Sequence, residues 1–184
     1  MRKLILQINM TLDGFADHTA VVADAEMHDF WTRQLDSVDT LLYGRVTYKL
    51  MEYWHTAKND PSLPKSLVKF AEKFIAKPKV VFSHTLSSGR DNERFVNTDP
   101  FEEVQRLKKQ PGKNMSISGI SLSNEFMKRG LIDEYLLLIH PVVAGKGRRL
   151  FDGVENLKLK LLNTKKLRSG AIANHYSVRN LSSS

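Results

Sequence analysis

Hydrophobic and polar positions follow two different periods along the first two thirds of the chain. Short apolar runs predict strands, and apolar positions three or four residues apart predict helices. Strands are expected at residues 3–10, 40–43, 79–83, 94–97, 115–118 and 134–143. Helices are expected at residues 25–35, 45–53, 65–76, 100–109 and 122–129. Because strand and helix alternate, the pattern favours a mostly parallel sheet with right-handed crossovers.

The last part of the chain changes its pattern. Residues 157–167 and 171–179 are expected to pair as a hairpin around Ser169 and Gly170. We therefore expect an α/β fold with a central, mostly parallel sheet of about eight strands, helices on both faces and an antiparallel C-terminal hairpin. No linker rich in proline or glycine divides the chain, so one domain is expected over residues 1–180, followed by a disordered tail at 181–184.

Composition narrows the possible classes of protein. The 184 residues are 41% hydrophobic and 26% charged, which is typical of globular proteins. No stretch approaches the roughly 20 apolar residues of a membrane helix, and the interrupted apolar start of the chain indicates a strand rather than a signal peptide. The absence of cysteine excludes disulfides, thiolate catalysis and iron–sulfur clusters, and the six scattered histidines predict no metal site. We expect a cytoplasmic protein that binds no membrane.

The net charge of +8 leaves two interpretations, a nucleic-acid-binding surface or a site for an anionic small ligand. Lysine and arginine are spread along the chain, and no basic block is interleaved with aromatic residues. No nucleic-acid partner is therefore expected, and an ordinary solvated surface explains most of the lysines.

Two strand ends could hold a phosphate. Gly44, Arg45 and Thr47 come where a strand runs into a helix, and unpaired first-turn amides with a nearby arginine suit an anion. Gly119 follows the strand at 115–118, where a glycine permits close approach of a pyrophosphate to the backbone. Taken singly, each is explained better by an ordinary turn or a packing glycine.

Two further loops leave strand ends. Residues 11–17 contain Asp13 and Gly14, a pair that favours a turn and could form a loop over an active site. Residues 140–151 lead from a long apolar strand into a basic loop with two glycines, Gly145 and Gly147. This segment is either a surface loop or a mobile wall beside an anionic ligand.

Together and in this order, these segments resemble the dihydrofolate reductase-like superfamily. The resemblance spans nearly the whole chain. Within the superfamily, the chain is most similar to the reductase domain of riboflavin biosynthesis proteins, the RibD C-terminal domain, and to its stand-alone bacterial relatives. It rests on residues 11–14, 44–47, 118–119, 130–134 and 140–151, of which the last two blocks are the most specific.

The resemblance implies an NADPH-dependent oxidoreductase that reduces a small pyrimidine-like or pterin-like heterocycle. By that resemblance the cofactor phosphates would lie at Gly44, Arg45 and Thr47, the adenosine near Ser83 and His84, and the pyrophosphate along Gly119, Ile120 and Ser121. Asp13 would face the nicotinamide and is the candidate catalytic acid, and Gly145 would border the same cleft. Family members are commonly homodimers, for which residues 134–143 and 157–162 are the expected apolar edge strands.

The chain also departs from the family pattern. Ser118 stands where the family usually has the first glycine of a pair, and neither Glu26 nor Asp29 falls in the register of the carboxylate with which dihydrofolate reductases grip the pterin. Folate is therefore not the expected substrate. The alternative to a reductase is a nucleotide-binding protein of the same fold without turnover.

Overall fold

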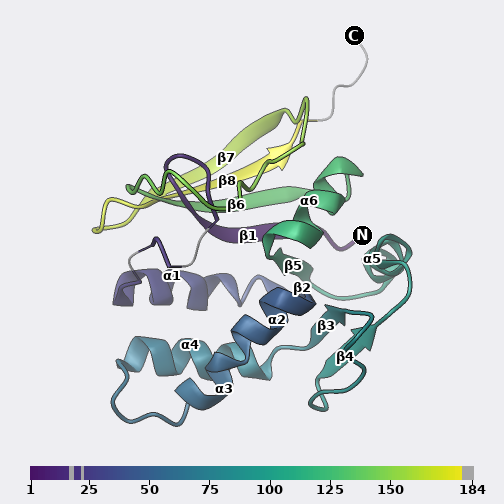
Figure 1. The fold of residues 1–184 in the computed structure, drawn as a ribbon, viewed down its shortest axis with the longest axis horizontal. Helices are drawn as coiled ribbons and strands as arrows, with labels where there is room; N and C mark the ends of the chain where they lie inside the picture. Colours follow the sequence, from purple (N-terminus) through teal and green to yellow (C-terminus); the bar gives the residue numbers. More distant parts are fainter. Residues whose placement is uncertain (17–18, 22, 180–184) are drawn as a thin grey trace.

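The computed structural model describes residues 1–16, 19–21 and 23–179, so Asp17 of the first loop and the predicted tail at 181–184 lie outside the described residues. Strands and helices alternate through the first two thirds of the chain and give way to consecutive strands after β6, as the sequence pattern predicts (Figure 1). The strands are β1 (Leu4–Thr11), β2 (Val38–Gly44), β3 (Lys79–Phe82), β4 (Glu93–Val96), β5 (Asn114–Ser118), β6 (Glu134–His140), β7 (Leu159–Lys166) and β8 (Ile172–Val178). The helices are α1 (Ala25–Gln34), α2 (Arg45–Met51), α3 (Tyr53–Ala57), α4 (Lys65–Ala76), α5 (Pro100–Lys109) and α6 (Ile120–Lys128).

In this part of the chain the strands form one eight-stranded sheet in the order β4-β3-β2-β5-β1-β6-β8-β7. The first six strands in the sequence are parallel, while β8 pairs antiparallel with both β6 and β7. This confirms the predicted mostly parallel sheet with an antiparallel C-terminal hairpin. The expectation that residues 134–143 form an edge strand was wrong, because β8 covers that side of β6. The outer strand is β7, and the homodimer stays a prediction.

Helices cover both faces of the sheet, and strand side chains alternate between them. On one face, Leu6 and Ile117 belong to a core that includes Phe126 of α6 and Leu107 of α5. On the other face, Ile5 packs with α1 in a second cluster, and a third cluster joins β2 to α4. Ligand sites in such sheets lie outside the carboxyl ends of the strands, which places the predicted loops at one edge.

Local sequence signals explain several boundaries, and tertiary structure shifts others. Asp24 caps α1 by accepting a hydrogen bond from the Met27 N–H at 2.7 Å. The helix expected at 45–53 is instead two helices that meet at Glu52, and α6 begins at Ile120 rather than at residue 122. The strand expected to reach residue 143 ends at His140, because the next residue is proline and has no N–H for the ladder.

None of the helices in the described part of the chain is both long and apolar enough to span a membrane.

Candidate active site

The predicted site residues follow the carboxyl ends of five neighbouring strands. In sheet order these strands are β3, β2, β5, β1 and β6. At about 4.8 Å per strand, the row spans roughly 19 Å. The residues that it carries are, in the same order, Ser83 and His84, then Gly44, Arg45 and Thr47, then Gly119, Ile120 and Ser121, then Asp13, and finally Gly145.

The centre of the row is the contact between the first turn of α2 and the start of α6. Tyr43 pairs with Ser118, so Gly44 and Gly119 follow on neighbouring parallel strands. Gly119 has φ +97°, and a Cβ at this position would overlap the Thr47 side chain. The two separate phosphate candidates of the sequence thus form one surface, on which Arg45 is exposed.

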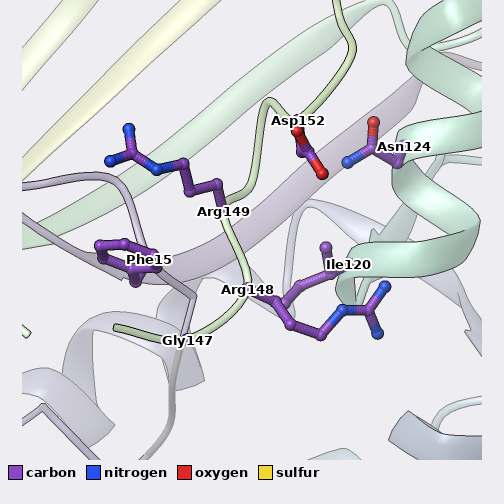
Figure 2. A pocket seen from close by; sticks show the side chains of 7 residues that line it. All are labelled: Phe15, Ile120, Asn124, Gly147, Arg148, Arg149 and Asp152. Atoms are coloured by element: carbon purple, nitrogen blue, oxygen red, sulfur yellow. The ribbon is translucent and has the colours of Figure 1, made fainter. Parts of the chain in front are cut away.

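A cavity of about 280 Å³ lies beside the start of α6 (Figure 2). Ile120 and Asn124 line it from α6, and Phe15 lines it from the loop after β1. Arg148 donates to Ser121 Oγ at 3.0 Å, and the Arg149 guanidinium lies 4.9 Å from the centre of the Phe15 ring. The cavity therefore offers two cations next to a helix N-terminus, together with the carboxylate of Asp152, and an anion would bind on the arginine side.

Asp13 joins the first loop to the basic loop after β6. Its carboxylate accepts hydrogen bonds from Thr11 Oγ1 at 2.6 Å, from the Gly145 N–H at 2.8 Å and from the Ala144 N–H at 3.1 Å. The bonds from Thr11, Gly145 and Ala144 lower the pKa of the Asp13 carboxyl to about 2. At neutral pH Asp13 is therefore an anion with no proton to give, and its contacts are those of a loop anchor.

The residues after β3 lie at the far end of the row. Phe82 pairs with Gly44 in the sheet. Ser83 is the next residue and therefore lies beside the beginning of α2. Its buried hydroxyl accepts from the Thr85 N–H at 3.2 Å and the Leu86 N–H at 3.0 Å, which holds the turn. His84 is exposed beside it.

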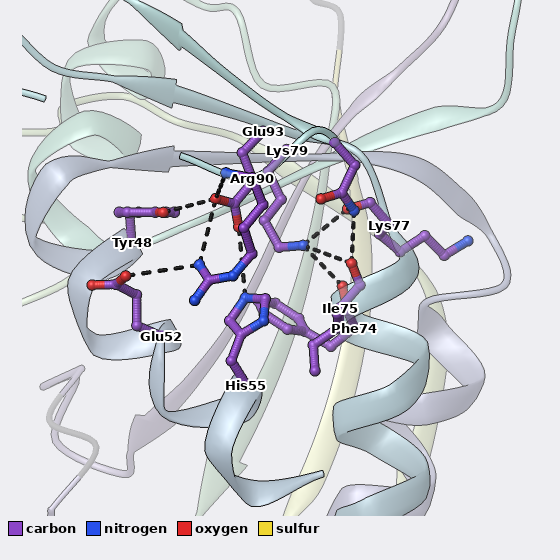
Figure 3. A network of polar contacts seen from close by, with 10 residues as sticks. Tyr48, Glu52, His55, Phe74, Ile75, Lys77, Lys79, Arg90 and Glu93 are labelled. Atoms are coloured by element: carbon purple, nitrogen blue, oxygen red, sulfur yellow. Dashed lines mark hydrogen bonds and ion pairs between the residues drawn. The ribbon is translucent and has the colours of Figure 1, made fainter. Parts of the chain in front are cut away.

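A buried polar network fixes α2 to the other end of the β3–β4 pair (Figure 3). Tyr48 Oη donates to Glu93 Oε2 at 2.8 Å, and the Arg90 N–H donates to the same oxygen at 3.0 Å. Burial opposes the charge on Glu93, but these hydrogen bonds and the nearby Lys79 and Arg90 cations hold its pKa below the usual value. Burial lowers the pKa of Lys79 to about 8, and its ammonium donates to three backbone carbonyls.

A second cavity, of about 150 Å³, lies between the sheet and the layer formed by α1, α3, α4 and the end of α2. Its floor on the central strands is polar, and comprises Gln7 and Asn9 of β1 with Ser116 and Ser118 of β5. Ser116 Oγ donates to Gln7 Oε1 at 3.0 Å, and Ser118 Oγ donates to the Gln7 backbone carbonyl at 2.6 Å.

Asn9 is held from two sides. Trp31 Nε1 donates to Asn9 Oδ1 at 3.1 Å, and His140 Nε2 lies 3.2 Å from the same oxygen. Burial lowers the pKa of His140, so the imidazole is neutral at pH 7. Because an indole N–H only donates, the oxygen of the Asn9 amide must face Trp31.

The walls of this second cavity are aromatic. Trp54 and Phe70 meet edge to face with ring centroids 4.6 Å apart, and His28 lies edge-on to both. His28 Nδ1 is 2.7 Å from the carbonyl oxygen of Asp24, so Nδ1 carries the hydrogen. Neither carboxylate of α1 lines the cavity, and Glu26 instead accepts from the Arg168 N–H at 2.7 Å.

None of the site residues predicted from the sequence lines this cavity, and Ser118 was noted only as a departure from the family pattern, although a signal was present. Gln7 and Asn9 occupy alternate positions of an otherwise apolar strand, as do Ser116 and Ser118. Polar residues at a spacing of two inside buried strands point to one face, where they need a partner. Trp31 and Trp54 carry no comparable signal, because aromatic residues at helical spacing usually form core.

Comparisons with known proteins agree with this architecture. YyaP of Bacillus subtilis (strain 168), which is uncharacterised, is 37% identical over 180 residues, covering 93% of this chain and 92% of YyaP. The structure of a diaminohydroxyphosphoribosylaminopyrimidine deaminase/5-amino-6-(5-phosphoribosylamino)uracil reductase from Thermotoga maritima is similar with a TM-score of 0.66 at 16% identity, over 97% of this chain and 57% of that one.

Dihydrofolate reductase from Enterococcus faecalis, complexed with NADP(H), is similar with a TM-score of 0.64 at 13% identity and 97% coverage of both chains. At these identities the two structures show the shared fold. The model of the RibD C-terminal domain family matches residues 2–173, which is nearly the whole chain. The protein therefore belongs to the RibD C-terminal domain family and has the dihydrofolate reductase-like fold.

Proposed function

We propose that this protein is an NADPH-dependent reductase of a small heterocyclic substrate. The observation that carries the proposal is the row of five neighbouring strand ends, with Gly44, Thr47 and Gly119 packed at its centre. Roughly 19 Å of strand ends suits an extended dinucleotide. Membership of a family of reductase domains supports the same reaction class.

The residues present fit the cofactor. Only glycine fits at position 119, because the Thr47 side chain packs directly against the backbone there, and the first-turn amides of α6 beside it could donate to a pyrophosphate. Arg45 is exposed at the start of α2, where its guanidinium can grip the 2′-phosphate that distinguishes NADPH from NADH. The cavity at Arg148 and Arg149 continues this surface toward the loop anchored by Asp13. When bound, the nicotinamide supplies the hydride.

The substrate would occupy the second cavity. Ser118 belongs to its floor, and the next residue, Gly119, starts the cofactor surface, so the two sites adjoin. The protein's own part would be to exclude water and to align a flat ring between the polar floor and the aromatic walls. Asp13 is no longer the favoured acid, and water or a residue of the second cavity would supply the proton.

The test is NADPH oxidation by the purified protein, screened against neutral pyrimidines and pterins, with reactions lacking the heterocycle as controls. Turnover that requires a heterocycle supports the proposal. The Arg45→Ala variant should raise KM for NADPH and leave kcat within about twofold, because a 2′-phosphate contact is the same in the ground state and the transition state. Bound NADPH with no turnover on any compound would instead support the nucleotide-binding protein without turnover.

A further inference from the structure

The second cavity differs from the first in its charge. Arg148, Arg149 and Asp152 line the first cavity, whereas no Asp, Glu, Lys or Arg among the described residues lines the second. Burying an ionised group without a partner is costly. A phosphate, a carboxylate or a protonated amidine in the second cavity would therefore lack a counter-charge.

The polar floor offers hydrogen-bond donors. The Asn9 oxygen accepts from Trp31, and the Gln7 side-chain oxygen accepts from Ser116. The indole N–H, which only donates, orients the Asn9 amide and leaves its NH₂ group without a partner among residues 1–16, 19–21 and 23–179. The Ser116 hydroxyl both donates and accepts, so it does not fix the orientation of the Gln7 amide. The Ser116 hydroxyl donates to the side chain of Gln7, and the Ser118 hydroxyl donates to its backbone carbonyl. A ligand that satisfies this floor must bring acceptors.

The walls and the volume of the second cavity limit the shape of the ligand that it can bind. Trp54 and Phe70 present ring faces and edges that favour a flat conjugated partner. A volume of about 150 Å³ matches a ligand of benzene size, so the cavity takes a single ring and leaves no room for a sugar phosphate beside it.

We propose that the second cavity binds an uncharged, flat ring with carbonyl acceptors on its edge, of the cyclic-imide or conjugated-ketone class, and rejects both phosphorylated and diamino-substituted rings. The proposal deepens the proposed function, since this ring would be the hydride acceptor. By this proposal, the protein would differ in its substrate from a reductase that acts on a phosphoribosyl compound.

Three related probes test the proposal without any cofactor. Thymine has two ring carbonyls, thymidine 5′-monophosphate adds a sugar phosphate to the same ring, and 2,4-diaminopyrimidine replaces both carbonyls by amino groups. Trp31 and Trp54 are the two tryptophans of the chain, and both line the cavity, so saturable quenching of intrinsic fluorescence reports occupancy. Thymine should bind at least about tenfold more tightly than either other probe, because each mismatch leaves buried polar groups unpaired.

A matched pair of variants locates the effect. Asn9→Asp keeps an oxygen for Trp31 but replaces the NH₂ donors by a carboxylate oxygen, so preference should shift to 2,4-diaminopyrimidine by about tenfold or more. Asn97→Asp adds the same charge at an exposed position and should leave the order unchanged. Circular dichroism checks folding, and the wild-type comparison decides alone if Asn9→Asp does not fold.

Equal or tighter binding of either other probe by the wild type, or no saturable binding of thymine, would overturn the proposal. An unchanged preference in folded Asn9→Asp would do the same. Failure of NADPH to bind is a separate result, because it removes the proposed reductase while leaving the ring preference measurable.

Discussion

At the scale of single residues, Gly119 lies where the start of α6 packs against Thr47 in the first turn of α2. Its φ of +97° and the contact of a would-be Cβ with Thr47 exclude every side chain. Gly119→Ala should lower the free energy of unfolding by roughly 2–5 kcal/mol, from backbone strain plus overpacking. Urea unfolding measures the loss, and Thr47→Ala in the same chain should return part of it.

The control is Gly130→Ala, because Gly130 also has positive φ (+65°) but no heavy atom within 4 Å of a would-be Cβ. The free energy of unfolding of that variant should fall by only about 1–2 kcal/mol, which is the cost of the backbone strain alone. Equal losses in the two variants would contradict the close contact between Gly119 and Thr47.

Residue roles were only partly predictable. The position of Gly44, Thr47 and Gly119 at neighbouring strand ends followed from a local signal, a glycine or small residue where a strand ends, and their role in binding a cofactor stays a prediction. The contacts of Asp13 could not, because they depend on Ala144 and Gly145, which lie more than a hundred residues away in the sequence.

At the scale of elements, Glu93 connects α2 to the β3–β4 pair (Figure 3). Because its pKa is lowered in the folded state, ionised Glu93 stabilises the fold above its unfolded pKa, and this stabilisation is lost as pH falls through the folded pKa. Glu93→Gln should therefore lose roughly 1–3 kcal/mol at pH 7, and the gap to the wild type should narrow at acidic pH.

Urea unfolding at neutral and acidic pH measures this gap. Glu72→Gln, at an exposed position of α4, is the matched control and should stay within about 0.5 kcal/mol of the wild type. A Glu93→Gln loss that is the same at both pH values would show that the charge of Glu93 does not act as described.

Element type followed from periodicity, but boundaries and partners did not. Residues 45–53 favour a helix without interruption, yet the chain turns at Glu52. Tyr48 and Trp54 pack in the same hydrophobic cluster from the two helices on either side of this turn. The position of β6 inside the sheet depends on β8, which pairs with it from more than thirty residues later. A local sequence pattern does not show which strands pair when they lie this far apart in the sequence.

At the scale of the whole molecule, the order of strands brings the predicted loops together. Alternating strands and helices predict a parallel sheet, and parallel strands place their carboxyl ends at one edge. The order β3-β2-β5-β1-β6 then makes neighbours of segments that span residues 11–145. The second cavity was not predictable in this way, because its walls come from four helices whose packing the pattern does not specify.

The most direct measurement of the central claim is isothermal titration of the purified protein with NADPH and, separately, with NADH. We expect NADPH to bind more tightly, Arg45→Ala to weaken NADPH by roughly 10- to 100-fold while leaving NADH unchanged, and Lys49→Ala on the exposed side of the same helix to have little effect. Binding of neither nucleotide would contradict the account, and the fold would then serve another function.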